Sequence, residues 1–323
     1  MRKLGPGREF DLIRSFFPEA PAQRIDIQVG AGDDAAVVRG QGIVLSADLS
    51  VEDVHFRRDW LTPQQIGFRA ATAALSDLAA MAARPIGVLA SLAVRDTDAG
   101  AMAPDVMAGV RAAVHRVGGV LLGGDLTASP GPLVLDVIAV GEAKTPLLRT
   151  GAQAGDELWV TGSLGGAALA VRSLLAGRPV AASTLARYLE PTARVEEARW
   201  LSDRNLLRAM LDLSDGLAGD AGHLARASGV AILIDAAAVP VQETLRAELP
   251  AEQALQLALS GGEDYELLFA AAAGTVSPHR EEFEATFRCS LTRVGAFRQG
   301  EGVYLRSLSG DVEPLVAGGF QHF

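Results

Sequence analysis

Lysine is almost missing from this chain of 323 residues. Lysine and arginine together number 29, yet only Lys3 and Lys144 are lysines. No Gly-x-x-x-x-Gly-Lys-Ser/Thr sequence occurs, which excludes a nucleotide site of the P-loop type. Any phosphate group that the chain binds must therefore be held by arginine, by backbone amides or by metal ions.

Cysteine and histidine are scarce as well. Cys289 is the single cysteine, so the chain can form neither an internal disulfide nor a thiolate metal cluster, and a reducing compartment fits best. The five histidines include no close pair and no His-Glu-x-x-His sequence, which argues against a zinc hydrolase. A Gly-x-Ser-x-Gly serine nucleophile motif is also absent.

Positive charge and long apolar runs are the remaining deficits. Asp and Glu number 39, so the formal net charge is −10, which argues against a nucleic-acid partner bound through its backbone phosphates. No run approaches the roughly 18 apolar residues of a membrane span. The N-terminus has glycine, proline and charge where a signal peptide needs an apolar stretch. We expect a cytoplasmic protein without a nucleic-acid or membrane partner.

The length predicts roughly two domains, at about 150 residues per domain, and 49% hydrophobic residues suffice for a core in each. A stretch rich in proline, glycine and polar residues at 144–156 separates two series of helix and strand patterns. We therefore expect an α+β fold with two α/β domains, 1–148 and 149–323. The elements expected in the first domain are strands at 43–49, 87–94, 120–122 and 133–140 and helices at 64–83 and 105–117.

Carboxylates beside glycine or serine are the unusual feature that is present. Six strings carry them: Gly32-Asp33-Asp34, Ser46-Ala47-Asp48, Leu75-Ser76-Asp77, Gly123-Gly124-Asp125, Asp212-Leu213-Ser214-Asp215-Gly216 and Gly261-Gly262-Glu263-Asp264. Any one of them is ordinary turn chemistry, because Asp and Gly are common turn residues. Six such strings in one chain favour a functional site built from carboxylates.

Strand alternation places acidic side chains on common faces. Ser46 shares one face with Asp48, and Asp212 shares one with Ser214. Because an unpaired buried carboxylate is costly, such residues need an arginine, amide donors or a metal ion. Mg²⁺ takes oxygen ligands and is commonly shared between carboxylates and substrate phosphates. A glycine-rich turn at 162–166, before an expected helix, offers amides to an anion.

The strings at 32–37, 46–56, 75–81, 123–125, 212–217 and 260–267 resemble the thiamine-monophosphate kinase family. They also match the wider superfamily of aminoimidazole ribonucleotide synthetase and selenophosphate synthetase, although the reactive N-terminal cysteine of the latter is missing here. The resemblance implies ATP-dependent phosphorylation of thiamine phosphate to thiamine diphosphate. It further implies a homodimer in which the mixed sheets of the N-terminal domains pair, and a C-terminal α+β sandwich.

The resemblance also implies roles for residues. The Mg²⁺ ligands would be Asp34, Ser46, Ala47, Asp48, Asp77, Asp125, Asp212 and Asp215, with Ala47 standing where threonine is usual and with Asp77 and Asp212 essential for catalysis. ATP would be bound by Gly124, Asp125, Arg149 and Ser214. Thiamine phosphate would be bound by His55, Glu263 and Phe320. Ala74 and Leu126 also depart from the family's usual asparagine and threonine.

The chemistry of the residues is compatible with this reaction. A phosphate monoester has a second pKa of about 6, so it is already a nucleophile at neutral pH and needs no general base. What it needs is cancellation of the repulsion between two anions, which Mg²⁺ held by aspartates provides. Two alternatives stay open: another ATP-using synthetase of the superfamily with a different acceptor, or a non-catalytic nucleotide-binding scaffold whose acidic turns are structural.

Overall fold

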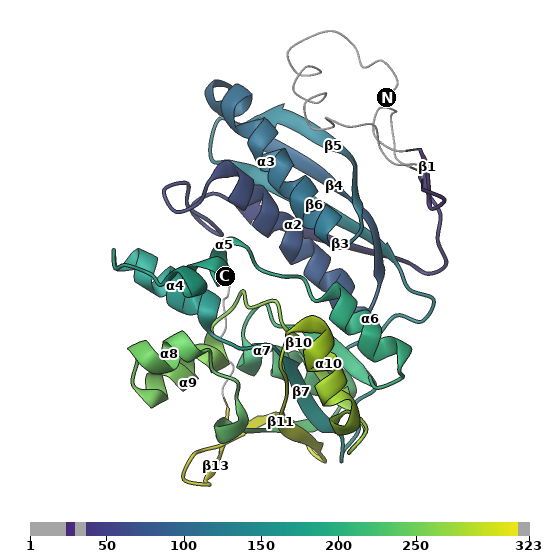
Figure 1. The fold of residues 1–323 in the computed structure, drawn as a ribbon, viewed down its shortest axis with the longest axis vertical. Helices are drawn as coiled ribbons and strands as arrows, with labels where there is room; N and C mark the ends of the chain where they lie inside the picture. The colour runs from purple at the N-terminus through teal and green to yellow at the C-terminus, as the bar shows by residue number, and fades with distance from the viewer. Residues whose placement is uncertain (1–23, 30–36, 316–323) are drawn as a thin grey trace. The chain divides into compact units, whose positions relative to one another are not determined.

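A computed structural model describes residues 24–29 and 37–315. The chain divides into two compact units, one comprising residues 1–78 and 83–146 and the other residues 79–82 and 147–323 (Figure 1). The domain limits 1–148 and 149–323 stay a prediction. Within the described ranges, no helix is long and apolar enough to cross a membrane.

The first unit contains a four-stranded sheet with the order β3-β6-β4-β5. Its strands are β3 (Ile43–Val51), β4 (Arg84–Val94), β5 (Val120–Ala128) and β6 (Val134–Glu142). β4 and β5 run parallel, whereas β6 runs antiparallel to both β3 and β4. The mixed sheet expected in this half is thus confirmed.

Two helices, α2 (Pro63–Ala80) and α3 (Asp96–Arg116), cover one face of this sheet (Figure 1). They approach so closely that a Cβ on Gly67 would lie 1.8 Å from the carbonyl oxygen of Val106, so only glycine fits at this position. α3 begins nine residues before the expected helix at 105–117, so the prediction of its start was wrong. Pro104 lies inside it and removes one backbone hydrogen bond, but the helix continues on its buried residues, among them Val110.

The end of β5 (Val120–Ala128) was also predicted wrongly, because the sequence places two glycines inside the strand. The expected strand ended at residue 122, whereas β5 continues through Gly123, Gly124 and Asp125 to Ala128. A Cβ on Gly124 would lie 1.8 Å from the carbonyl oxygen of Ala90 in β4. The Gly-Gly pair therefore permits a close strand contact and does not end the strand.

The sheet face opposite α2 and α3 is called here the open face. The short strands β1 (Ile27–Val29) and β2 (Val37–Val38) form an antiparallel pair. Ile27 packs with Val38 against Ile86 and its buried neighbours. Along β3, the apolar side chains on this face are exposed to solvent. They are Ile43, Leu45 and Leu49, exposed by 41%, 66% and 51%.

The second unit contains a seven-stranded sheet with the order β13-β12-β9-β11-β7-β10-β8. β12 and β9 are parallel and the other neighbours are antiparallel. The strands are β7 (Glu157–Thr161), β8 (Ala209–Asp212), β9 (Ala231–Asp235), β10 (Leu267–Ala271), β11 (Leu291–Arg298), β12 (Val303–Arg306) and β13 (Val312–Pro314).

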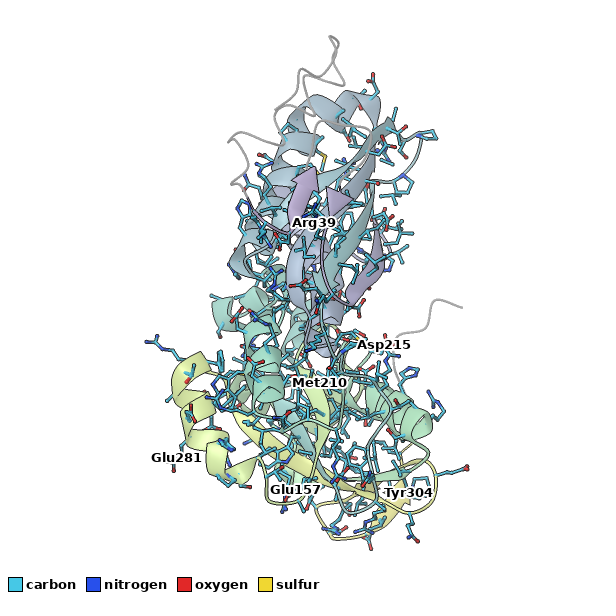
Figure 2. All side chains as sticks on the ribbon, turned by 90° about the vertical axis from the view of Figure 1, so that its right-hand side faces the viewer. Arg39, Glu157, Met210, Asp215, Glu281 and Tyr304 are labelled. Carbon is cyan, nitrogen blue, oxygen red and sulfur yellow. The ribbon has the colours of Figure 1, made fainter. Side chains whose placement is uncertain are left out.

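Helices cover both faces of this sheet, which confirms the expected α+β sandwich (Figure 1). α7 (Leu217–Ser228) and α9 (Ala251–Ser260) pack on one face, and α6 (Val195–Asp203) and α10 (Arg280–Phe287) lie over the other. The remaining helices form a side layer or single turns: α4 (Gly166–Leu175), α5 (Ala182–Leu189), α8 (Glu243–Glu248), η1 (Ala236–Ala238) and η2 (Ser277–His279). In Figure 2, Met210 lies among the interior side chains, whereas Glu281 lies at the surface.

Candidate active site

Two side chains of β3 lie on the helix-covered face of the first sheet, where one of them contacts a side chain of α2. The cross-strand partners of Ser46 and Asp48 are Ala139 and Val137, which are fully buried. The hydroxyl of Ser46 donates a hydrogen bond to the carboxylate of Asp77. The prediction that Ser46 and Asp48 share a face is confirmed. With Asp77 they form a set of oxygen donors that we name the β3–α2 group.

The side chain of Ala47, another predicted ligand, does not join this group. Ala47 pairs with Ile138, and its exposed methyl group lies on the open face, so its side chain supplies no ligand atom. Asp34 and Phe320 lie outside the described residues. A role for residue 47 in metal binding is thus limited to its backbone carbonyl.

Asp125 lies on the opposite face of the same sheet. It pairs with Ser91, which pairs with Asp136, which pairs with Leu49 of β3, so these four residues form one row across the open face. Three strand spacings, about 14 Å in all, separate β5 from β3. Two ligands of one hard divalent ion lie within about 5 Å of each other. A single ion therefore cannot contact both Asp125 and Asp48 of one chain.

His55 lies in the turn that follows β3. Its Nδ1 accepts a hydrogen bond from the N–H of Val51 at 3.1 Å. An accepting Nδ1 places the proton of a neutral imidazole on Nε2. The half-buried ring therefore presents an N–H donor, which is the polarity that a phosphate oxygen requires.

The predicted ligands of the second unit lie at the end of β8. Leu211 and Leu213 both pack into the core with α7, as the alternation predicts, while Asp212 between them is 5% exposed. The chain then turns through Ser214 and Asp215, which are both half-buried, before α7 begins. We name residues 212–216 the β8 turn.

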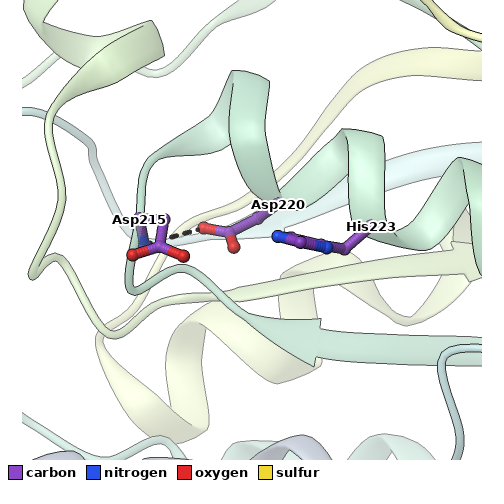
Figure 3. Close-up of side chains that lie close together, drawn as sticks. All are labelled: Asp215, Asp220 and His223. Carbon is purple, nitrogen blue, oxygen red and sulfur yellow. Dashed lines mark hydrogen bonds between the residues drawn. The ribbon is translucent and has the colours of Figure 1, made fainter. Parts of the chain in front are cut away.

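A carboxylate that sequence reasoning missed lies against the β8 turn. Asp220, in the first turn of α7, accepts a hydrogen bond through Oδ2 from the N–H of Asp215 at 3.1 Å (Figure 3). The same oxygen accepts a second from the N–H of Gly216 at 3.0 Å. Burial, together with the charges of Asp212 and Asp215, raises the pKa of Asp220 to about 8. The available signal was an acidic residue shortly after a glycine that precedes a helix.

The chain around Glu263 runs beside the β8 turn. The N–H of Glu263 donates to the carbonyl of Ser214, and that of Tyr265 donates to the carbonyl of Leu213, both at 2.9 Å. Glu263 and Tyr265 have left-handed backbones, with φ of 67° and 51°. Such conformations are costly for residues other than glycine and cluster at functional sites. The structure thus brings a predicted substrate residue, Glu263, beside a predicted ATP residue, Ser214.

The glycine-rich turn at 162–166 binds a carboxylate of the chain itself. Asp264 accepts hydrogen bonds from the N–H of Gly165, at 2.7 Å, and from that of Ala167. These amides lie at the N-terminus of α4, where negative charge is favoured. The acceptor at this turn is therefore the carboxyl group of Asp264, and burial raises its pKa to about 7.

Glu266, two residues after Asp264, is buried and forms an ion pair with Arg194. It is 1% exposed, and Arg194 donates two hydrogen bonds to its carboxylate, at 2.7 Å and 2.6 Å. The hydroxyl of Thr161 donates a third at 2.7 Å. The charge of Glu266 is thus paired within the core, which gives it a structural role.

Arg149, a predicted ATP residue, is exposed at the start of the second unit. Its carbonyl accepts a hydrogen bond from the hydroxyl of Ser228 at 2.9 Å. Burial lowers the pKa of His223 on α7, and the charges of Arg226 and Arg149 lower it further. Since His223 lies close to Asp215, Arg149 belongs to the same side of this unit as the β8 turn.

Carboxylate and hydroxyl oxygens of the β3–α2 group and the β8 turn suit a hard cation such as Mg²⁺. The mutual repulsion of Asp212, Asp215 and Asp220 is a further fit, because a cation would relieve it. Among the described residues, one group of three His, Cys, Asp or Glu side chains has its ligand atoms within 4.8 Å of one another: Asp215, Asp220 and His223 (Figure 3).

Comparisons with known proteins agree with this architecture. Residues 32–143 match the N-terminal domain of AIR synthase related proteins, and residues 153–303 match their C-terminal domain. The thiamine-monophosphate kinase of Escherichia coli K12 is 35% identical over 269 residues, which is 81% of this chain and 82% of that protein.

Solved structures are similar over nearly the whole chain. The crystal structure of thiamine-monophosphate kinase from Stenotrophomonas maltophilia has a TM-score of 0.80 and 36% identity, with 91% of this chain and 94% of that chain covered. A structure of AaThiL complexed with AMPPCP and TMP has a TM-score of 0.75 and 27% identity, with 97% and 96% covered. This chain therefore belongs to the AIR synthase related proteins and, within them, to the thiamine-monophosphate kinase family.

Proposed function

We propose that this chain transfers the γ-phosphoryl group of ATP directly to thiamine phosphate, in line and with Mg²⁺, to form thiamine diphosphate. The supporting observation is that carboxylates gather in the β3–α2 group and the β8 turn of a chain that has almost no lysine. The relative AaThiL, similar over 97% of this chain, was solved with AMPPCP and TMP.

Mg²⁺ would be held by Ser46, Asp48, Asp77, Asp125, Asp212 and Asp215, with Asp34 and the backbone carbonyl of Ala47 completing the predicted set. When bound, it would supply charge neutralisation between the polyphosphate and the acceptor phosphate. Asp77 and Asp212 are the members whose loss should abolish activity.

The other residues bind and orient the two substrates. His55 would donate from Nε2 to an oxygen of the acceptor phosphate, which attacks without a general base. Glu263 would place its carboxylate against the positively charged thiazolium of thiamine phosphate. Gly124, Arg149 and Ser214 would contact ATP, with the arginine offering charged donors to its phosphates.

A homodimer through the open face is part of the proposal. Exposed Leu45 and Leu49 on β3 give this face an apolar surface that a second copy can cover. Asp125 and Asp48 of one chain are too far apart to share an ion. One site can use both residues if Asp48 comes from one chain and Asp125 from its partner.

The test is formation of thiamine diphosphate by the purified protein with ATP, Mg²⁺ and thiamine phosphate. Asp77→Asn and Asp212→Asn should each reduce kcat by at least about 100-fold without unfolding the chain. Asp203→Asn, an exposed residue of α6, is the matched control and should keep wild-type activity.

A panel of acceptors, scored by ADP release, separates the alternatives. Turnover with another phosphorylated or carboxylated acceptor, and none with thiamine phosphate, would support a different synthetase of the superfamily. ATP binding without turnover for every acceptor would support the scaffold hypothesis.

A further inference from the structure

We propose that Asp220 is a positioning residue, which fixes the backbone of the β8 turn and thereby orients Ser214 and Asp215 without binding metal or substrate itself. The proposal rests on the proposed function only for the roles of Ser214 and Asp215. The claim that Asp220 fixes the backbone of the β8 turn does not depend on the proposed function.

Two hydrogen bonds carry the proposal. Asp220 is 4% exposed, and its Oδ2 accepts from the N–H groups of Asp215 and Gly216, at 3.1 Å and 3.0 Å. The N–H of Asp220 in turn donates to the carbonyl of Gly216 at 3.0 Å. A side chain inside the helix thus holds the two residues that precede it, and closes the turn in both directions.

The rest of the turn is fixed from the opposite side. The carbonyl of Ser214 accepts from Glu263, and the N–H of Leu213 donates to the carbonyl of Glu266 at 2.7 Å. Gly216 has φ of 107°, and a Cβ there would lie 2.8 Å from the carbonyl carbon of Ser260. The turn is therefore confined between α7 and the segment that follows α9. Without Asp220, the amides of Asp215 and Gly216 would lose their partner in a confined place.

The competing interpretation is a metal site formed by Asp215, Asp220 and His223, whose ligand atoms lie close together. Two features of the cluster favour positioning instead. Oδ2 of Asp220 already accepts two hydrogen bonds, and Nδ1 of His223 accepts one from Arg226 at 2.9 Å. The positive charge of Arg226 also opposes a cation beside His223.

Three variants distinguish the two interpretations. Asp220→Asn keeps an oxygen that can accept both amide hydrogen bonds but replaces the carboxyl group that a metal ion would need as a ligand. If Asp220 is a positioning residue, Asp220→Asn should keep kcat and the Mg²⁺ requirement within about threefold of the wild type. Asp220→Ala should lose about 10- to 100-fold in kcat, as is typical of residues that orient ligands. His223→Ala should stay within about threefold, because positioning does not use the imidazole.

If Asp220→Asn loses as much activity as Asp220→Ala and His223→Ala also weakens Mg²⁺ binding, Asp220 is a ligand and the proposal is overturned. The Asn variant decides the matter by itself if the Ala variant does not fold. Rescue by asparagine would show that the two accepted hydrogen bonds, and not a carboxylate ligand, are what the turn requires.

Amide hydrogen exchange gives a readout that does not depend on catalysis. The N–H groups of Asp215 and Gly216 should exchange slowly in the wild type and in Asp220→Asn, and faster in Asp220→Ala, while amides of β7 stay unchanged. Unchanged exchange in Asp220→Ala would overturn the proposal even if that variant loses activity. If no variant, nor the wild type, phosphorylates thiamine phosphate, the proposed function fails while the exchange data still test the role of Asp220.

Discussion

The carboxylate of Asp264 accepts a hydrogen bond from the N–H of Gly165, 2.7 Å away, at the start of α4. Its pKa is raised from 3.8 to about 7 by burial. Between these values the folded chain keeps a proton that the unfolded chain releases. The free energy of unfolding should therefore fall as the pH rises from about 4 to about 7, by at most about 1.4 kcal/mol per pH unit from this group.

Asp264→Asn removes this titration while keeping an oxygen at the helix end. The difference in unfolding free energy between the variant and the wild type should grow in favour of the variant across that pH window. Urea unfolding at several pH values measures it, with Asp203→Asn as a control that changes one exposed carboxylate. Parallel curves for the wild type and Asp264→Asn would contradict this prediction.

Gly162 lies against the buried carboxylate of Glu266. It has φ of 61°, and a Cβ there would lie 2.0 Å from Oε1 of Glu266, which Arg194 holds in place. Gly162→Ala should lower the free energy of unfolding by about 3 kcal/mol or more, because the left-handed backbone and the displaced ion pair both contribute. Denaturant unfolding of the purified variant gives the value.

Gly274→Ala is the matched control for that substitution. Gly274 has a similar φ of 75°, but a Cβ there would meet no atom within 4 Å. Gly274→Ala should lower the free energy of unfolding only by the cost of the left-handed backbone, about 1–2 kcal/mol. Equal losses in the two variants would show that the contact with Glu266 is unimportant.

Cys289 should be inert in the folded chain. Its side chain is buried, and burial together with the charge of Glu266 raises the pKa of the thiol to about 12. Because the thiolate is the reactive form, a thiol reagent at about pH 8 should label the native protein only at the rate of unfolding. One thiol per chain should react at once in denaturant, and rapid labelling of the native protein would contradict the prediction.

The separation of Asp48 and Asp125 predicts complementation between inactive variants. If one site uses Asp48 from one chain and Asp125 from its partner, a mixed dimer of Asp48→Asn and Asp125→Asn retains one intact site. Equal mixing after joint refolding should restore about a quarter of wild-type activity, since half of the dimers are mixed and each has one working site. Recovery that is no greater than the sum of the separate variants would place both residues in one chain.

Sequence patterns predicted regular elements well where hydrophobic periodicity decides structure. β3, β6 and α2 lie close to the expected ranges 43–49, 133–140 and 64–83, because alternation or helical spacing matches their burial. β5 and α3 were wrongly bounded because Gly-Gly and proline read locally as breaks, while packing overrides both. The short helices α5 and α8 were not predicted at all, since too few turns are present to show a period.

The site was predictable in part. Repeated Asp and Gly strings pointed to Ser46, Asp48 and Asp77. Ser46 and Asp77 are hydrogen-bonded although they lie 31 residues apart in the sequence. Sequence spacing could not show that Asp125 faces the other way, because that depends on the strand order. Nor could it distinguish Asp264, which caps a helix within the chain, from its neighbour Glu263, which the fold places beside the β8 turn.

β3 serves two surfaces with one strand. Residues 46 and 48 face α2, whereas residues 45, 47 and 49 form part of the open face. Insertion or deletion of one residue before Ser46 would exchange the two sets, placing leucines beside Asp77 and polar groups where a second copy is proposed to dock. Length changes inside residues 43–51 should thus be far less tolerated in this family than point substitutions, and variation in length should be confined to the connecting loops.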